Sequence, residues 1–234
     1  RSLLLDVFQD SLVPAPIPPA GVTVSTRYIP GDDRLLLGGD FFDAIRLPNG
    51  SLGYIIGDVC GQGARAAALG AAVRSGWKTL ATTAPDEPLR WVTGLDDTFF
   101  RLGRHTDAFV TLNTGVVELG DTRLWRFVSA GHPWPVVIGD RVHVVEPVVG
   151  PPLGAGQHEA WAETSLDVVG DTTILMYTDG LIENAAPGER RRNDGEGRLV
   201  DYLERHPFDL EHLLARFGPE GFDDDVAVVA IAFN

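Results

Sequence analysis

The spacing of apolar positions along the chain predicts groups of strands separated by pairs of helices. In some segments, apolar residues alternate with polar ones or run together between turn residues, and both patterns are typical of β-strands. The predicted strands are Val22–Ile29, Phe41–Leu47, Leu52–Asp58, Ala108–Leu119, Arg123–Ser129, Pro135–Ile138, Val142–Val145, Thr172–Tyr177 and Val226–Phe233. Elsewhere, apolar residues recur every three or four positions, as on one face of a helix. The predicted helices are Ala64–Thr82, Pro85–Leu102, Glu196–Arg205 and Phe208–Phe217.

Short turn sequences between neighbouring strands predict antiparallel pairing. Pro48-Asn49-Gly50 separates two strands, and Asn-Gly is a strong hairpin signal. Gly120-Asp121 and Gly139-Asp140 each lie in a short turn between adjacent strands. Two consecutive helices between groups of strands do not fit the regular alternation of a parallel doubly wound sheet. We therefore expect the α/β (α+β layered) class, an antiparallel β-sandwich flanked by helices.

The N-terminal segment differs from the rest of the chain. Apolar residues in Ser2–Leu12 have helical spacing, which predicts the end of a helix entering from upstream. Pro14–Pro19 contains four prolines, so it is predicted to be an extended connector that joins neither helix nor sheet. Residues 1–20 are thus expected to be a linker helix and connector, and residues 21–234 a single domain.

Composition and charge exclude several classes of function. The 234 residues are 44% hydrophobic and 22% charged, which suits a globular domain with a sizeable core. Lys and Arg number 19 against 33 Asp and Glu, a net charge of −14, so no partnership with nucleic acid or an anionic membrane is expected. No apolar run is long enough for a membrane span. A single cysteine, Cys60, fits a reducing compartment, and a cytoplasmic location is expected.

Four aspartates share one local context, an apolar run followed by Asp and then a small or acidic residue. They are Asp40, Asp58, Asp179 and Asp224. A carboxylate at the end of a hydrophobic strand is costly to ionise unless a cation lies nearby, and the same motifs contain no Lys or Arg. Oxygen ligands of this kind select magnesium, manganese or calcium. Taken singly, each aspartate could equally be a helix cap or turn residue, so the metal site depends on all four converging.

The glycine-rich segment after the second of these aspartates admits two interpretations. Gly61-Gln62-Gly63 lies between a predicted strand and a predicted helix, where backbone groups can approach an ion or a phosphate. Together with Ala66 it also matches the dinucleotide fingerprint G-x-G-x-x-A. The antiparallel strands that follow argue against that second interpretation. Cys60, in the same loop, is expected to be a small buried filler rather than a nucleophile, since no cation adjoins it in sequence.

Read together, five segments resemble motifs of the type 2C metal-dependent protein phosphatases, specifically the bacterial SpoIIE/RsbU-like branch of serine/threonine phosphatases. In chain order these are Leu37-Gly38-Gly39-Asp40-Phe41-Phe42-Asp43, Gly57-Asp58-Val59-Cys60-Gly61-Gln62-Gly63, Ser129-Ala130-Gly131-His132-Pro133, Tyr177-Thr178-Asp179-Gly180 and Asp224-Asp225-Val226-Ala227. The resemblance spans nearly the whole chain. It implies the layered fold predicted above and a serine/threonine phosphatase activity.

The resemblance implies a role for each candidate residue. Asp58 would bridge two divalent cations, manganese or magnesium, and the carbonyl of Val59 would complete one of them. Asp179 and Asp224 would hold the second cation, and Asp40 would act beside the first. A water activated by these metals would attack the phosphorus of a phosphoserine or phosphothreonine, so catalysis through Asp58, Asp179 and Asp224 would be indirect.

Some residues depart from the family pattern, and others have two alternative roles. Arg34 is the one residue comparable to a phosphate-gripping arginine of eukaryotic relatives, and Gln62 stands where His or Lys is frequent. His132 is interpreted as a structural residue at a strand end, with general acid catalysis as the alternative. The Arg190–Arg192 run is interpreted as a solvated loop, with contact to an acidic partner or a substrate phosphate as the alternative.

The resemblance also implies partners. The usual substrate in this branch is a phosphorylated STAS-type anti-anti-sigma protein, and an upstream sensor domain is common. A homodimer is one alternative for the oligomeric state. The rival class of function is a pseudophosphatase, inactive or weakly active, that keeps the fold and binds a partner; a two-metal nuclease is disfavoured by the acidic charge.

Overall fold

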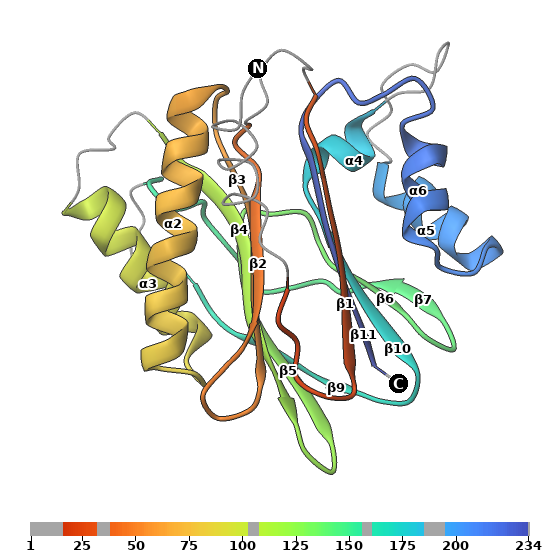
Figure 1. Cartoon of the computed structure of the whole chain (residues 1–234), viewed down its shortest axis with the longest axis horizontal. Coiled ribbons are helices and arrows are strands. Elements are labelled where there is room, and N and C mark those ends of the chain that lie inside the picture. Colours follow the sequence, from red (N-terminus) through yellow and green to blue (C-terminus); the bar gives the residue numbers. More distant parts are fainter. Residues whose placement is uncertain (1–15, 32–37, 103–107, 156–160, 185–194, 234) are drawn as a thin grey trace.

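Two β-sheets face each other at the centre of the molecule, and helices cover both outer faces (Figure 1). The computed structural model describes residues 16–31, 38–102, 108–155, 161–184 and 195–233. Over these ranges the layers run helix, sheet, sheet, helix. The layered, antiparallel-rich α/β sandwich predicted from the sequence is therefore confirmed. The linker helix predicted for Ser2–Leu12 lies outside the described residues.

The first sheet has its strands in the order β2-β3-β4-β5-β8, and β9 pairs with β5 beside β8. Their bounds are β2 (Phe41–Arg46), β3 (Leu52–Val59), β4 (Val110–Leu119), β5 (Arg123–Ala130), β8 (Val149–Gly150) and β9 (Thr164–Val168). The β2–β3 and β4–β5 hairpins are antiparallel, as their turn sequences predict. Strand β3 also pairs antiparallel with β4, so the two intervening helices do not form a βαβ crossover. This topology is not that of a dinucleotide-binding unit.

The second sheet has the order β1-β11-β10-β6-β7, and its pairs are antiparallel. Its strands are β1 (Val22–Ile29), β6 (Val136–Ile138), β7 (Val142–Val144), β10 (Thr172–Tyr177) and β11 (Val226–Phe233). Strand β11, the last strand of the described chain, lies between β1 and β10. Because every side chain of β11 but that of Ala232 is buried, this strand reads as a continuous apolar run rather than an alternating one.

Helices cover the outer face of each sheet. Helices α2 (Ala64–Thr83) and α3 (Pro88–Asp96) pack on the first sheet, and a π-helical turn, η1 (Asp97–Arg101), continues α3. Helices α4 (Asp179–Glu183), α5 (Gly195–Arg205) and α6 (Leu210–Phe217) lie over the second. None of the helices in the described part of the chain is long and apolar enough to cross a membrane.

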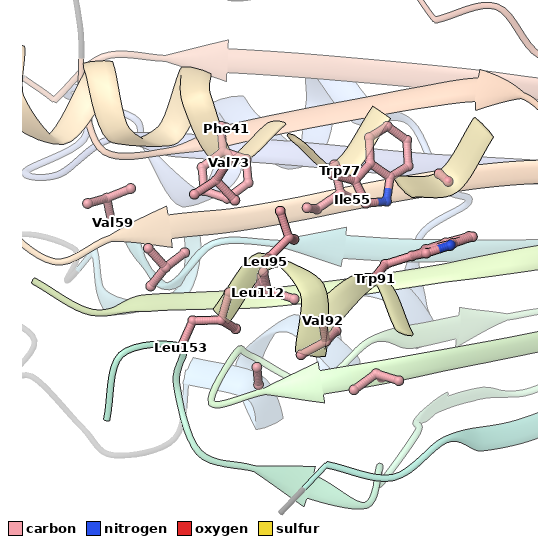
Figure 2. Close-up of a cluster of buried hydrophobic side chains, with 14 of the residues drawn as sticks. Phe41, Ile55, Val59, Val73, Trp77, Trp91, Val92, Leu95, Leu112 and Leu153 are labelled. Atoms are coloured by element: carbon pink, nitrogen blue, oxygen red, sulfur yellow. The ribbon is translucent and has the colours of Figure 1, made fainter. Parts of the chain in front are cut away.

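Three apolar clusters fill the spaces between the layers. The cluster between the first sheet and α2 and α3 includes Trp77 and Trp91, whose rings meet edge to face with centroids 6.2 Å apart (Figure 2). The cluster between the two sheets includes Trp125, and the third lies under α5 and α6. Edge-to-face packing is favourable for aromatic rings of this size. These tryptophans are fully buried core residues.

Several local predictions were wrong, each for a physical reason. The predicted helix Pro85–Leu102 begins at Pro88, because proline is favoured in the first turn of a helix and Glu87 supplies the cap position. Strands β8 and β9 were missed because they are short, with two and five residues. Ile17, inside the predicted free connector, forms a bridge with Ile45: its N–H donates to the Ala44 carbonyl and its carbonyl accepts from Arg46. Proline on both sides does not remove the N–H of the residue between.

Candidate metal centre

The ends of four strands place the predicted site residues at one end of the sandwich. In the first sheet, Asp40 immediately precedes β2, and Asp58 lies at the end of β3, which runs antiparallel to β2. In the second sheet, Asp179 follows β10 and Asp224 precedes β11, which again runs antiparallel. An antiparallel pair brings the start of one strand beside the end of the other. Each sheet therefore contributes two carboxylates from segments far apart in sequence.

Glycines let the two loops of the first sheet approach closely. The Val59 N–H donates to the Gly39 carbonyl over 3.2 Å. A Cβ atom at Gly39 would lie 2.5 Å from the Val59 carbonyl oxygen and 2.6 Å from Asp58 Oδ1, distances that real Cβ atoms do not reach. Any other residue at Gly39 would therefore displace two oxygens that are predicted to be metal ligands.

A fifth aspartate, Asp225, joins the loop before β2 to the start of β11. The Gly31 N–H donates to Asp225 Oδ1 over 3.0 Å, and a Cβ at Gly38 would lie 1.4 Å from Asp225 Oδ2. The Tyr28 hydroxyl accepts from the Gly38 N–H over 2.8 Å. These contacts hold the Gly-Gly-Asp loop against the second sheet. Asp225 was not singled out from the sequence, although it is the second residue of the Asp-Asp motif.

The hydroxyl of Thr178 connects the two sheets directly. It donates to Asp40 Oδ2 over 2.6 Å and accepts from the Ala227 N–H over 2.8 Å. The Thr178 N–H in turn donates to the Ala227 carbonyl over 3.0 Å. Thr178 is fully buried between Tyr177 and Asp179. Its role was missed because a threonine before an aspartate resembles an ordinary helix cap; the signal was its place inside the Tyr-Thr-Asp-Gly motif.

Carboxylates at this end of the molecule raise one another's pKa. Burial raises the pKa of Asp58 to about 7, with repulsion from Asp179 as the next cause. Burial and repulsion from Asp58 raise the pKa of Asp40 well above its usual range, against the opposing effect of the Thr178 hydrogen bond. The pKa of Asp179 is raised by partial burial and then by Glu183 and Asp224. An interaction with the Asp40 side chain acts in the opposite direction and lowers the pKa of Asp58.

The predicted site residues have the oxygen donors that a hard divalent cation prefers. The donors are carboxylate and carbonyl oxygens, which suit magnesium and manganese. No ion pair between described residues involves Asp40, Asp58, Asp179 or Asp224. Within the described ranges, however, no three Asp, Glu, His or Cys side chains are close enough to hold one ion as they stand. Asp179 and Asp224 are exposed, and Asp224 Oδ1 accepts from the Asp225 N–H over 2.8 Å.

The other nominated residues fall into three groups. His132 is 4% exposed beyond the end of β5, as a structural residue would be. Cys60 is exposed, so its interpretation as a buried filler was wrong. It lies in the turn just past β3, where its N–H donates to the Phe109 carbonyl and its side chain points outward. Arg34 and Arg190–Arg192 lie outside the described residues.

Comparison with known proteins places the chain among phosphatases. The model of a family described as Stage II sporulation protein E (SpoIIE) matches residues 48–234. The RsbU and RsbW domains of Rv1364c from Mycobacterium tuberculosis superpose with a TM-score of 0.80 at 25% identity, over 94% of this chain and 61% of that one. The PP2C phosphatase domain with a regulatory-domain fragment of SpoIIE from Bacillus subtilis gives 0.75 at 18% identity, over 91% and 64%. RsbX in complex with magnesium gives 0.68 at 13% identity, over 91% and 96%. This chain thus spans less than two thirds of the first two.

Proposed function

The chain belongs to the SpoIIE family of PP2C-type phosphatases, and on that premise we propose that it hydrolyses phosphoserine or phosphothreonine on a regulatory protein with the help of two divalent cations. The observation that carries the proposal is the gathering of Asp40, Asp58, Asp179 and Asp224 at one end of the sandwich without a basic partner among the described residues. Mutual repulsion makes such a cluster costly unless it serves a cation.

In this proposal Asp58 would contribute to both ions, the Val59 carbonyl and Asp40 would help to hold the first, and Asp179 and Asp224 would hold the second. Bound magnesium or manganese would supply a water of lowered pKa and neutralise phosphate charge. RsbX, a similar fold, was crystallised with magnesium. Asp58 must be ionised to act as a ligand, so metal binding to this chain should release protons near neutral pH.

The chain's own residues then have two tasks. Thr178 and the Asp225 contacts hold the loops of the two sheets together at the end of the sandwich where the carboxylates lie. Gly39 lets the loop before β2 pack directly against Asp58 and Val59, where any side chain would clash with their oxygens. No nucleophilic side chain is required, because phosphoryl transfer depends chiefly on positioning and charge neutralisation.

The proposed function also implies a protein substrate. We infer a phosphorylated STAS-type protein as substrate, since the similar Mycobacterium tuberculosis structure joins an RsbU domain to an RsbW domain. That chain and the similar SpoIIE structure both extend well beyond the part matched here, which supports an additional regulatory domain. A cytoplasmic location is proposed on the single cysteine of the sequence.

Hydrolysis of p-nitrophenyl phosphate and of a phosphoserine peptide, with and without manganese, tests the proposal. The parent is compared with Asp58→Asn and Asp179→Asn. Asp43→Asn is the matched control, because Asp43 is a buried aspartate on the face of β2 that points away from the other sheet. Manganese-dependent activity that is lost in the first two variants and kept in the control is the expected result.

A different outcome identifies the rival function. A folded parent that hydrolyses neither substrate with manganese or magnesium, yet binds a STAS protein, is a pseudophosphatase. Equal activity in the parent and Asp58→Asn would contradict the assigned centre.

A further inference from the structure

His132 lies beside β4, the strand next to the one that carries Asp58. Its Nδ1 is 3.1 Å from the hydroxyl oxygen of Thr111 on β4. Thr111 is the register partner of Asp58 across the β3–β4 pair. Directly opposite residues on neighbouring strands point to the same face of a sheet, with Cβ atoms about 4.5–5.5 Å apart. The imidazole is therefore one hydroxyl removed from the carboxylate expected to bridge the metals.

The other edge of the imidazole faces the second sheet. Nε2 is buried and has no hydrogen-bond partner among the described residues, and the backbone carbonyl of Tyr177 interacts with the imidazole, which opposes the lowering of its pKa by burial. Tyr177 ends β10 two residues before Asp179. One ring thus contacts the strand beside Asp58 and the strand that leads to Asp179. If Nε2 carries the proton, Nδ1 can accept from Thr111 while Nε2–H points at the carbonyl.

An acid–base role does not suit this environment. Burial lowers the pKa of His132 to about 3, so the imidazole is neutral at physiological pH. A neutral imidazole has no proton to spare as a general acid near pH 7, and both of its nitrogens face protein groups. A fixed neutral histidine with one donor and one acceptor can, however, hold two strands at a set separation.

We propose that His132 is a positioning residue that holds β4, and with it Asp58, against the end of β10 that carries Asp179. This inference rests on the proposed phosphatase function. It assigns to the Ala-Gly-His-Pro segment a structural tie between the two halves of the centre. Removing the contacts of His132 should separate the two pairs of carboxylates. Metal affinity should then fall more than the stability of the fold does.

Valine substitution of Thr111 removes the hydroxyl with little change of shape. Thr114 provides a matched control on the same strand, because its buried hydroxyl also makes one hydrogen bond across β3–β4, to the Tyr54 carbonyl over 2.7 Å. Manganese affinity is measured by calorimetry and kcat with p-nitrophenyl phosphate, alongside thermal unfolding. We expect Thr111→Val to weaken manganese binding and kcat by about 5- to 10-fold, Thr114→Val to change both less than 2-fold, and Thr111→Ser to restore them.

Nitrogen NMR of the imidazole in the metal-free protein gives a readout independent of activity. We expect His132 to be neutral at pH 7 with the proton on Nε2, and Thr111→Val to shift the Nδ1 resonance while Thr114→Val leaves it unchanged. A protonated ring, a proton on Nδ1, or equal effects of the two valine substitutions would overturn the proposal. A parent without phosphatase activity would instead contradict the proposed function, and the NMR result would still decide the tie.

Discussion

Two aspartates of one motif, Asp40 and Asp43, have opposite surroundings although only two residues separate them. Asp43 is 1% exposed on the helix-facing side of β2, where Lys78 of α2 lies 2.8 Å from Oδ2 and the Ala44 N–H donates to Oδ1. Asp40 faces the other sheet, where its neighbours are Thr178 and further carboxylates. The chain neutralises the first carboxylate with its own lysine and leaves the second uncompensated. An uncompensated carboxylate cluster is therefore evidence of a bound cation, whereas a buried aspartate alone is not.

The largest expected difference between the two regions is in catalysis. Asp58→Asn removes the charge expected to bridge both ions, so kcat should fall by about 100-fold or more. Asp43→Asn should retain kcat within about 3-fold when assayed well below its unfolding temperature. Initial rates with p-nitrophenyl phosphate at saturating manganese measure both. Comparable losses in the two variants would remove the distinction between the regions.

A smaller effect is expected when manganese is added to the folded protein. A ligand that binds only the native state at 100 times its Kd stabilises that state by about 2.7 kcal/mol. The parent and Asp43→Asn should both gain stability on this scale, while Asp58→Asn and Asp179→Asn should gain little. Thermal unfolding with manganese and with EDTA measures the gain. An equal gain in Asp58→Asn would place the ion elsewhere.

Without metal, Asp43→Asn should lower the stability of the protein more than Asp58→Asn does, which is the reverse of their expected effects on kcat. Asp43→Asn loses an ion pair with a half-exposed lysine and should cost about 1–3 kcal/mol. Asp58→Asn relieves repulsion by Asp179 and should leave the metal-free chain as stable as the parent or more so. Urea unfolding in EDTA measures both. A clear loss of stability in Asp58→Asn would show that this carboxylate is structural.

Local patterns were sufficient to predict the layers of the fold. Apolar periodicity located β1, β3, α2 and β11 to within a residue or two at each end, because burial of one face dictates that spacing. The π-helical turn after α3 and the two-residue strand β8 could not be predicted, since tertiary contacts rather than periodicity select them.

The site was only partly predictable. Asp40, Asp58, Asp179 and Asp224 stood out by their position at strand ends. Thr178 and Asp225 did not, because their importance comes from hydrogen bonds to loops that are distant in sequence. Cys60 was misjudged since residue type alone cannot tell whether a turn side chain points inward.

A further expected effect is a pH dependence of the difference in stability between the parent and Asp58→Asn. Without metal, the folded chain raises the pKa of Asp58 from its usual 3.8 to about 7. Below about pH 4 the carboxyl is protonated in both folded and unfolded states, so it contributes no difference. Between pH 4 and 7 the folded state binds more protons than the unfolded state, so the parent's stability falls as pH rises. Asparagine does not titrate, and the variant should therefore gain on the parent over this window and hold its advantage above it. Thermal unfolding in EDTA from pH 4 to 8 measures this difference, and manganese should abolish the trend by favouring the ionised carboxylate. A difference that stays flat or shrinks with rising pH would mean that Asp58 is compensated within the fold, as Asp43 is by Lys78.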